Sequence, residues 1–282
     1  MHSPLSTPHA TIARLQELGL YTRKSLGQHF LVDDNVIGRI IELAACEPSD
    51  TVIEVGPGIG TLTLALQERV AHIIAIEYDE ALIEPLRDLT DPAVVEVVHA
   101  DAARLLREDG RRLSADRSKM VSNLPYQVAA TVILRAFESL PNLDSATVMV
   151  QKEVADRIRA AHSTKEYGAY TVKLALLAEP TGSFAVSPAS FLPPPRVDST
   201  VIRLRRREQV DSMDTYHRIR QVVDAAFGMR RKTLRNNLRT MVSDEAVIAA
   251  CEATDIDPGV RAETLTVEQF IDLESALTTQ DE

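Results

Sequence analysis

The chain has 282 residues, 45% of them hydrophobic, and a formal net charge of −10. This is the size and composition of a globular protein with one large or two modest domains. It has no apolar run of membrane length and no signal-peptide pattern, so we expect neither a membrane nor a secreted protein. Cys46 and Cys251 lie far apart without metal-ligand spacing, so we expect reduced thiols in a cytoplasmic protein.

The N-terminal part of the chain predicts a short helix and then a loop. The first residues are polar and contain proline, so we expect an N-terminal extension, residues 1–23, that is partly disordered around a helix over 12–20. The next stretch, KSLGQHFL (residues 24–31), reads as a loop with an apolar anchor, in which the polar atoms of His29 face a ligand. Apolar residues at helical spacing predict a helix over 36–44.

A glycine-rich stretch organises the first half of the chain. In TVIEVGPGIGTLTLAL, residues 51–66, β-branched apolar residues predict a parallel strand that is covered on both faces. Gly56, Gly58 and Gly60 then allow a sharp turn or a close approach to a ligand, and a helix begins at Leu62. This is the first strand, loop and helix of a Rossmann-like unit.

The spacing of these glycines favours S-adenosylmethionine (SAM) over a dinucleotide. Dinucleotide folds use G-x-G-x-x-G, whereas this chain has G-x-G-x-G. Glu77 ends a predicted second strand 21 residues after Gly56, where a carboxylate can accept from both ribose hydroxyls. Asp101 follows a third strand over 94–99 and can accept from an adenine amino group. A purely structural turn explains the glycines alone, but not these two acidic residues.

The middle of the chain continues with strands and helices. Its charged residues predict a loop over 105–119. Further segments follow in order: a strand over 120–122, a helix over 129–137, a strand over 146–150 with a polar helix after it, a mobile connection over 162–171, an undecided helix or strand over 172–178, and a strand over 197–204 that closes the sheet. Pro193 to Pro195 set a stiff loop before the last strand, and the pattern is helical from Asp211 onward.

The tetrapeptide Asn123-Leu124-Pro125-Tyr126 ends the predicted fourth strand and suits methylation of an adenine amine. That amine is a poor nucleophile because its lone pair is delocalised into the ring. The Asn123 side-chain oxygen and the Leu124 carbonyl can accept its two hydrogens, while Tyr126 offers a face for stacking. The reaction then depends on positioning and needs no metal. Phe191 is the candidate for the other face of the base, although it equally suits a core position.

Basic residues gather in the C-terminal third, although the whole chain is acidic. Residues 196–239 hold twelve Arg or Lys against five Asp or Glu, whereas residues 240–282 hold one against eleven. Leu234, Leu238 and Met241 predict a helix with arginines at four-residue steps on its other side. We expect RNA contacts from Arg230, Arg231, Lys232, Arg235 and Arg239. Ion pairs with the acidic segment or with the N-terminal domain are the alternative.

Together these motifs resemble the small-subunit ribosomal RNA adenine N6,N6-dimethyltransferases. The matching pieces are KSLGQHFL, EVGPGIGTLT, IEYD, NLPY, MVQKEVADRI, FLPPPRVDSTVIRL and AFGMRRKTLRNNL. The resemblance implies an α/β fold, a Rossmann-like SAM-dependent methyltransferase sheet over residues 24–208, and a small all-helical rRNA-binding domain over residues 209–282. It also implies methylation of N6 in two adjacent adenines near the 3′ end of small-subunit (16S) rRNA within the immature 30S subunit. We expect a monomer.

The resemblance also assigns residues to the site. It places the following residues around SAM: His29, Leu31, Gly56, Gly58, Glu77, Asp101, Ala102 and Asn123. It places Asn123, Leu124, Tyr126 and Phe191 around the target adenine. The family usually has Asn where this chain has His29, and a neutral imidazole can still donate one hydrogen bond there.

Two other functions remain open. A large-subunit rRNA adenine methylase is related, but the proline run and RRKTLRNNL argue against it. A ribosome assembly factor could bind RNA through the basic segment with methylation as a secondary role. A degenerate binder would have lost Glu77, Asp101 or Asn123, and all three are present.

Overall fold

The computed structural model describes residues 1–20, 29–113, 117–207 and 210–278. The chain forms two compact units. The sheet unit comprises Met1–Ala155 and Pro180–Arg206, and the helical unit comprises Asp156–Glu179 and Arg207–Glu282. The sequence-based division placed residues 156–179 with the sheet, whereas the structure packs them with the C-terminal helices.

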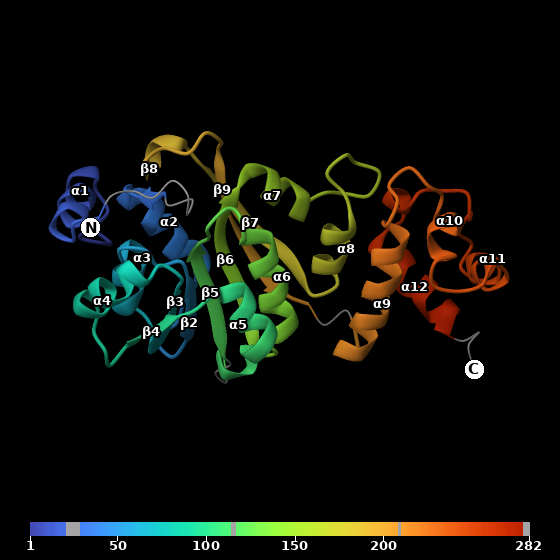
Figure 1. The fold of residues 1–282 in the computed structure, drawn as a ribbon, viewed down its shortest axis with the longest axis horizontal. Helices are drawn as coiled ribbons and strands as arrows, with labels where there is room; N and C mark the ends of the chain where they lie inside the picture. Colours follow the sequence, from blue (N-terminus) through green and yellow to red (C-terminus); the bar gives the residue numbers. More distant parts are fainter. Residues whose placement is uncertain (21–28, 114–116, 208–209, 279–282) are drawn as a thin grey trace. The chain divides into compact units, whose positions relative to one another are not determined.

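A seven-stranded sheet forms the centre of the sheet unit, in the order β4-β3-β2-β5-β6-β9-β7 (Figure 1). Its strands are β2 (Thr51–Val55), β3 (His72–Glu77), β4 (Val95–His99), β5 (Ser118–Asn123), β6 (Leu143–Gln151), β7 (Ala178–Val186) and β9 (Ser199–Arg206). Strands β2 to β6 pair in parallel and β9 pairs antiparallel with β6. Val52 and Ile53 are fully buried, as expected for a strand covered on both faces. The predicted α/β sheet is confirmed.

Helices cover this sheet (Figure 1). They are α2 (Asp34–Ala44), α3 (Thr61–Gln67), α4 (Glu80–Leu89), α5 (Ala102–Asp109) and α6 (Ala129–Ser139). Helix α2 packs on β6 and β9, α3 on β3, α4 on β3 and β4, and α6 on β6 and α5. Because β2 to β5 run in parallel, their carboxyl ends meet at one edge of the sheet, and the loops that follow them are brought together there.

Two parts of the sheet unit differ from the sequence-based expectation. The predicted loop over 105–119 begins instead as helix α5, whose Leu106 is fully buried while Arg104 pairs with Glu108 one turn later. A 3-10 helix continues it over Gly110–Leu113. The sheet is closed by β7 rather than by β9.

The N-terminal segment is more ordered than its composition predicts. Helix α1 (Pro8–Glu17) begins after Thr7, whose side chain caps it. Leu5 is 8% exposed and packs with Leu15 and Phe30, and the backbone N–H groups of His2 and Ser3 donate to Asp34. The expectation of partial disorder therefore does not hold for these residues. Most of the KSLGQHFL motif, residues 24–28, lies outside the described residues.

The helical unit contains α8 (Ala169–Ala175), α9 (Met213–Ala226), α10 (Leu234–Leu238), α11 (Asp244–Ala253) and α12 (Val267–Thr278). Helix α7 (Lys152–Ile158) leads the chain into it. The segment predicted to be mobile, residues 162–171, is fixed here: Tyr167 is 7% exposed, donates to the Leu265 carbonyl over 2.8 Å and packs near Phe227. The undecided segment over 172–178 contains both: α8 continues to Ala175, a turn follows, and Ala178 begins β7.

The predicted arginine-bearing helix is shorter than expected. Helix α10 ends at Leu238, and Arg231 precedes its Thr233 N-cap. Leu234 and Leu238 are buried as predicted, but Met241 is 40% exposed.

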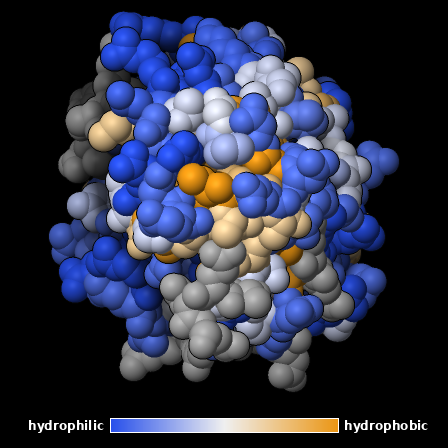
Figure 2. Space-filling view, turned by 90° about the vertical axis from the view of Figure 1, so that its right-hand side faces the viewer, coloured by the Kyte–Doolittle hydropathy of each residue, from blue (hydrophilic) through white to orange (hydrophobic). Residues whose placement is uncertain are grey.

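Figure 2 shows a largely hydrophilic surface around a small apolar patch. Among the described residues, no helix is both long and apolar enough to span a bilayer.

Candidate active site

A cavity of about 320 Å³ opens in the sheet unit where β2, β3 and β5 end. Its wall includes the glycine loop, the ends of β3 and β4, the NLPY turn and the short strand β1 (Phe30–Leu31). This edge is where ligands bind in open parallel sheets. The cavity also has the volume of a small-molecule site.

Two glycines in the cavity wall have a backbone conformation that disfavours side chains. Gly56 and Gly58 have φ values of 72° and 61°, in the left-handed region that disfavours other residues. A Cβ on Gly56 would lie 3.1 Å from the Pro125 ring, and one on Gly58 would lie 3.3 Å from the Phe30 ring. The glycines therefore bring the loop backbone to the NLPY turn and to the cavity.

Glu77 ends β3 with its carboxylate held by backbone amides. The Gly58 N–H donates to Oε2 over 3.0 Å, and those of Tyr78 and Asp79 donate to Oε1 over 2.9 and 2.8 Å. Burial raises the pKa of Glu77, and these three hydrogen bonds oppose the rise. Oε1 already accepts two hydrogen bonds, whereas Oε2 accepts one and keeps an acceptor site, so the arrangement suits a hydroxyl donor on a ligand.

Glu54 is a second buried carboxyl group in the wall, and the sequence analysis missed it. It is 1% exposed, and its Oε2 has no hydrogen-bond partner among the described residues. Burial raises its pKa to about 8, and the negative charge of nearby Glu77 adds to the effect. A carboxyl group inside the apolar run TVIEV was the signal available in the sequence.

Asp101 and Ala102 lie where β4 passes into α5, and both line the cavity. Asp101 is exposed, and its Oδ1 accepts from the Arg104 N–H over 3.1 Å as the N-cap of α5. The hydrogen bond to Oδ1 thus fixes the side chain, and the carboxylate keeps further acceptor sites for a ligand. The structure brings Asp101 to the same cavity as Glu77.

Asn123 lies at the end of β5, and its amide has a defined orientation. The NH2 group donates to the His29 carbonyl over 3.2 Å. A carbonyl can only accept, so this contact fixes the nitrogen toward His29 and leaves Oδ1 as an acceptor. Leu124 is 2% exposed, with its N–H bonded to the Met149 carbonyl over 3.2 Å. The NLPY turn is thereby tied to both neighbouring segments.

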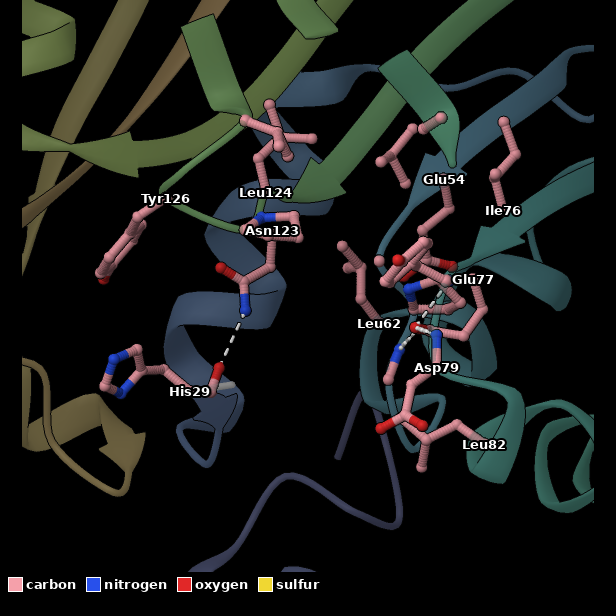
Figure 3. A pocket seen from close by; sticks show the side chains of 18 of the residues that line it. His29, Glu54, Leu62, Ile76, Glu77, Asp79, Leu82, Asn123, Leu124 and Tyr126 are labelled. Carbon is pink, nitrogen blue, oxygen red and sulfur yellow. Dashed lines mark hydrogen bonds between the residues drawn. The ribbon is translucent and has the colours of Figure 1, made fainter. Parts of the chain in front are cut away.

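Figure 3 shows that the cavity has two ends on either side of Asn123. Tyr126 and His29 lie at one end, and Glu77, Asp79 and Leu82 lie at the other. Phe191 does not line the cavity: it is 2% exposed, belongs to the hydrophobic core, and pairs through β8 (Phe191–Leu192) with Leu31 of β1. All the other residues predicted around SAM and the base line this one cavity.

The basic residues of the helical unit are partly neutralised. Arg235 donates through two nitrogens to Asp244, Arg239 lies 3.4 Å from the same carboxylate, and Arg230 lies 3.8 Å from Glu263. The Arg235 contact lowers the pKa of Asp244. Arg231 and Lys232 have no partner among the residues that the structure describes. The alternative of internal ion pairs thus applies to three of the five.

Comparison with known proteins connects this site to a family. A family model described as ribosomal RNA adenine dimethylase matches residues 19–279. Proteins named Ribosomal RNA small subunit methyltransferase A are similar along nearly the whole chain. That of Thermobifida fusca is 40% identical over 94% of each chain. That of Leuconostoc mesenteroides is 37% identical over 98% of this chain and 97% of its own.

Solved structures agree in fold. The 23S rRNA methyltransferase ErmE superposes with a TM-score of 0.65 at 27% identity, covering 88% of this chain and 99% of that one. A dimethyladenosine transferase from Plasmodium falciparum superposes with a TM-score of 0.72 at 24% identity, covering 87% and 96%.

The fold and the cavity define a protein with the Rossmann-like fold of the SAM-dependent methyltransferases. Within that class, the chain belongs to the ribosomal RNA adenine dimethylase family. The resemblance inferred from the motifs is confirmed.

Proposed function

We propose that this protein transfers methyl groups from SAM to N6 of two adjacent adenines near the 3′ end of small-subunit rRNA. The observation that carries the proposal is the oriented amide of Asn123, whose NH2 group is held by the His29 carbonyl so that Oδ1 is left as an acceptor. Family membership and the names of the relatives support rRNA as the substrate.

The residues of the cavity fit SAM. The loop at Gly56 and Gly58 lets a ligand approach the backbone, because no side chain stands there. Glu77 Oε2 has acceptor capacity for a ribose hydroxyl, and Asp101 for an adenine amine. When bound, SAM supplies an electrophilic sulfonium methyl group.

The NLPY turn positions the target amine. Asn123 Oδ1 and the Leu124 carbonyl accept its two hydrogens, which draws the nitrogen toward a tetrahedral shape and frees its lone pair for the methyl group. Tyr126 supplies a stacking face, and its hydroxyl is fixed by Ser199 Oγ at 2.7 Å. These residues catalyse the reaction by orienting the reactants. Such orientation lowers the activation free energy by several kcal/mol, about 7–11 in favourable cases.

The proposal also covers the state of the protein and its contacts with RNA. The protein acts as a monomer in the cytoplasm on immature 30S subunits, without a metal. Arg231 and Lys232 are the first RNA contacts of the helical unit, since their charges are not used by described carboxylates. Arg230, Arg235 and Arg239 reach phosphates by exchanging their present carboxylate partners.

The test is methyl transfer from radiolabelled SAM to small subunits that lack the modification, with mass spectrometry of the RNA to locate it. We expect dimethyladenine at two adjacent positions near the 3′ end. The large subunit belongs in the same assay, because the ErmE structure aligns over 88% of this chain. Labelling of the large subunit instead of the small one would favour that second function.

A further inference from the structure

The loop between β8 and β9 is bonded at both ends to residues of the cavity wall. The Pro193 carbonyl accepts from His29 Nδ1 over 2.7 Å, and Ser199 Oγ is hydrogen-bonded to the Tyr126 hydroxyl over 2.7 Å. His29 and Tyr126 both line the cavity, at the end away from Glu77 (Figure 3). The loop residues between Pro193 and Ser199 do not line the cavity themselves, so the loop lies behind these two side chains, at the outer rim.

The backbone of this loop is restrained along its length. Three consecutive prolines, residues 193–195, have φ angles that are locked by their rings, and Pro195 is buried. Beyond the tip, the Asp198 carbonyl accepts from the Lys152 N–H over 2.9 Å, and Ser199 is fully buried where β9 begins. A side chain at the tip is therefore presented from a fixed backbone, which lowers the entropy lost when it binds a partner.

Arg196 lies at the exposed tip of the loop. Its guanidinium group has no hydrogen-bond or ion-pair partner among the described residues. Arg104 and Arg107 of the same unit are exposed as well, but both pair with Glu108. A guanidinium group presents several N–H donors in one plane, which matches the oxygens of a phosphate group. The tip of the loop is therefore suited to bind a phosphate.

We propose that Arg196 binds a phosphate of the RNA strand next to the target adenine and holds that strand against the rim of the cavity. The inference rests on the proposed function. A base that enters the cavity stays attached to its strand, so the neighbouring phosphates remain outside at the rim. Arg196 is three residues before Ser199, so their Cα atoms are at most about 11 Å apart, and Ser199 is bonded to Tyr126. This contact belongs to the sheet unit and is separate from the basic segment of the helical unit.

The experiment compares Arg196→Ala and Arg196→Lys, with Arg107→Ala as the matched control. Arg107 is an exposed arginine in the last turn of α5, and its loss changes the net charge of the protein by the same amount. The probe is a short small-subunit RNA fragment that contains the two target adenines, with one phosphate beside them replaced in turn by an uncharged methylphosphonate. Fluorescence anisotropy measures RNA affinity between about 50 and about 200 mM salt, and calorimetry measures SAM affinity.

We expect Arg196→Ala to weaken RNA affinity about tenfold at about 50 mM salt and to lower the salt slope by about one unit, the contribution of one phosphate contact. Arg196→Lys should keep the slope, because lysine retains the charge. One of the methylphosphonates should weaken binding to the wild-type protein and have no further effect on Arg196→Ala, because the contact is already lost there. The RNA affinity of Arg107→Ala and the SAM affinity of all variants should stay within about twofold of wild type.

The inference is wrong if Arg196→Ala binds the fragment with wild-type affinity and slope. It is also wrong if every methylphosphonate weakens binding to wild type and to Arg196→Ala equally, or if Arg107→Ala loses as much RNA affinity as Arg196→Ala. A matching loss of SAM affinity in Arg196→Ala would mean that the substitution disturbs the cavity wall through the loop, and would overturn the phosphate contact. Absence of RNA methylation by the wild-type protein would refute the proposed function and this inference with it, whereas any of the earlier results beside active wild-type protein would refute the inference alone.

Discussion

The two units differ in the burial and pairing of their ionisable side chains. In the cavity of the sheet unit, Glu54 and Glu77 are almost fully buried with raised pKa values, and one oxygen of Glu54 lacks a partner. In the helical unit, Arg235 and Arg239 are about half exposed and share Asp244. Burial disfavours the charged form of a carboxyl group and raises its pKa, and groups perturbed in this way cluster at functional sites. Exposed pairs are worth little and can be exchanged.

The largest expected effect concerns the pH dependence of stability. Below the ordinary glutamate pKa of 4.5, Glu54 is protonated in both the folded and unfolded chains. Between 4.5 and about 8 the folded state keeps the proton that the unfolded state loses, so the free energy of unfolding falls as pH rises. Across this whole pH range the free energy of unfolding falls by up to ~5 kcal/mol. Glu54→Gln should remove this loss.

Urea unfolding of wild type and Glu54→Gln at about pH 5 and about pH 8 measures the effect. The variant should gain stability relative to wild type as the pH rises. Glu68→Gln is the control, because Glu68 is exposed on the same unit. Equal pH dependence in all three proteins would mean that Glu54 ionises normally in the folded state.

The next effect concerns turnover. Asn123→Ala should keep SAM affinity and lose about 10²–10³-fold in kcat, the usual result of removing one fixed hydrogen-bonding group from a reacting centre. Asn35→Ala, an exposed asparagine in α2, is the control. Single-turnover methylation of small subunits measures the loss. A variant as fast as wild type would show that the oriented Asn123 amide has no role in the reaction.

The ends of the parallel strands could be predicted from the sequence, and most of the site followed from them. β2 and β3 contain short apolar runs, and the residues after β2 to β5 meet because parallel strands end at one edge. The sequence placed Glu77, Asp101 and Asn123 at the ends of three predicted strands, and the structure has all three in the wall of one cavity. Glu54 was missed because it lies inside its strand and not at the end.

What was not predicted depended on partners far away in the chain. The His29 ring meets Tyr126, and Tyr167 bonds to the Leu265 carbonyl. Strand β7 contains Pro180 and Gly182 and has an exposed, irregular pattern, because it is an edge strand with one neighbour. The periodicity of a segment carries no information about contacts with residues far away in the chain. The segment over 162–171 was therefore expected to be mobile, because its contact with Leu265 could not be seen in the sequence.

A smaller effect is expected at the cofactor end. Glu77→Ala should weaken SAM binding by about 1.5–3 kcal/mol, the usual range for a hydrogen bond to a charged group. Calorimetric titration measures it. Glu80→Ala is a suitable control, because Glu80 is exposed at the start of α4. Undiminished affinity in Glu77→Ala would contradict its assignment to the ribose.

The smallest effect is expected in the helical unit, where it tests whether the exposed basic side chains bind RNA. Phosphate contacts release counterions, so each one adds about one unit to the salt dependence of RNA affinity. Arg231→Ala with Lys232→Ala should lower the slope by about two units. Arg235→Ala with Arg239→Ala should lower it less, because those arginines must first leave Asp244.

Asp244→Asn sharpens this last test. It removes the carboxylate that Arg235 and Arg239 share, so both guanidinium groups become available and RNA affinity at low salt should rise. SAM affinity should not change in any of these proteins, since the cavity lies wholly in the sheet unit. If Arg231→Ala with Lys232→Ala keeps the wild-type slope and Asp244→Asn gains nothing, the basic segment serves ion pairing and the RNA-binding face lies elsewhere.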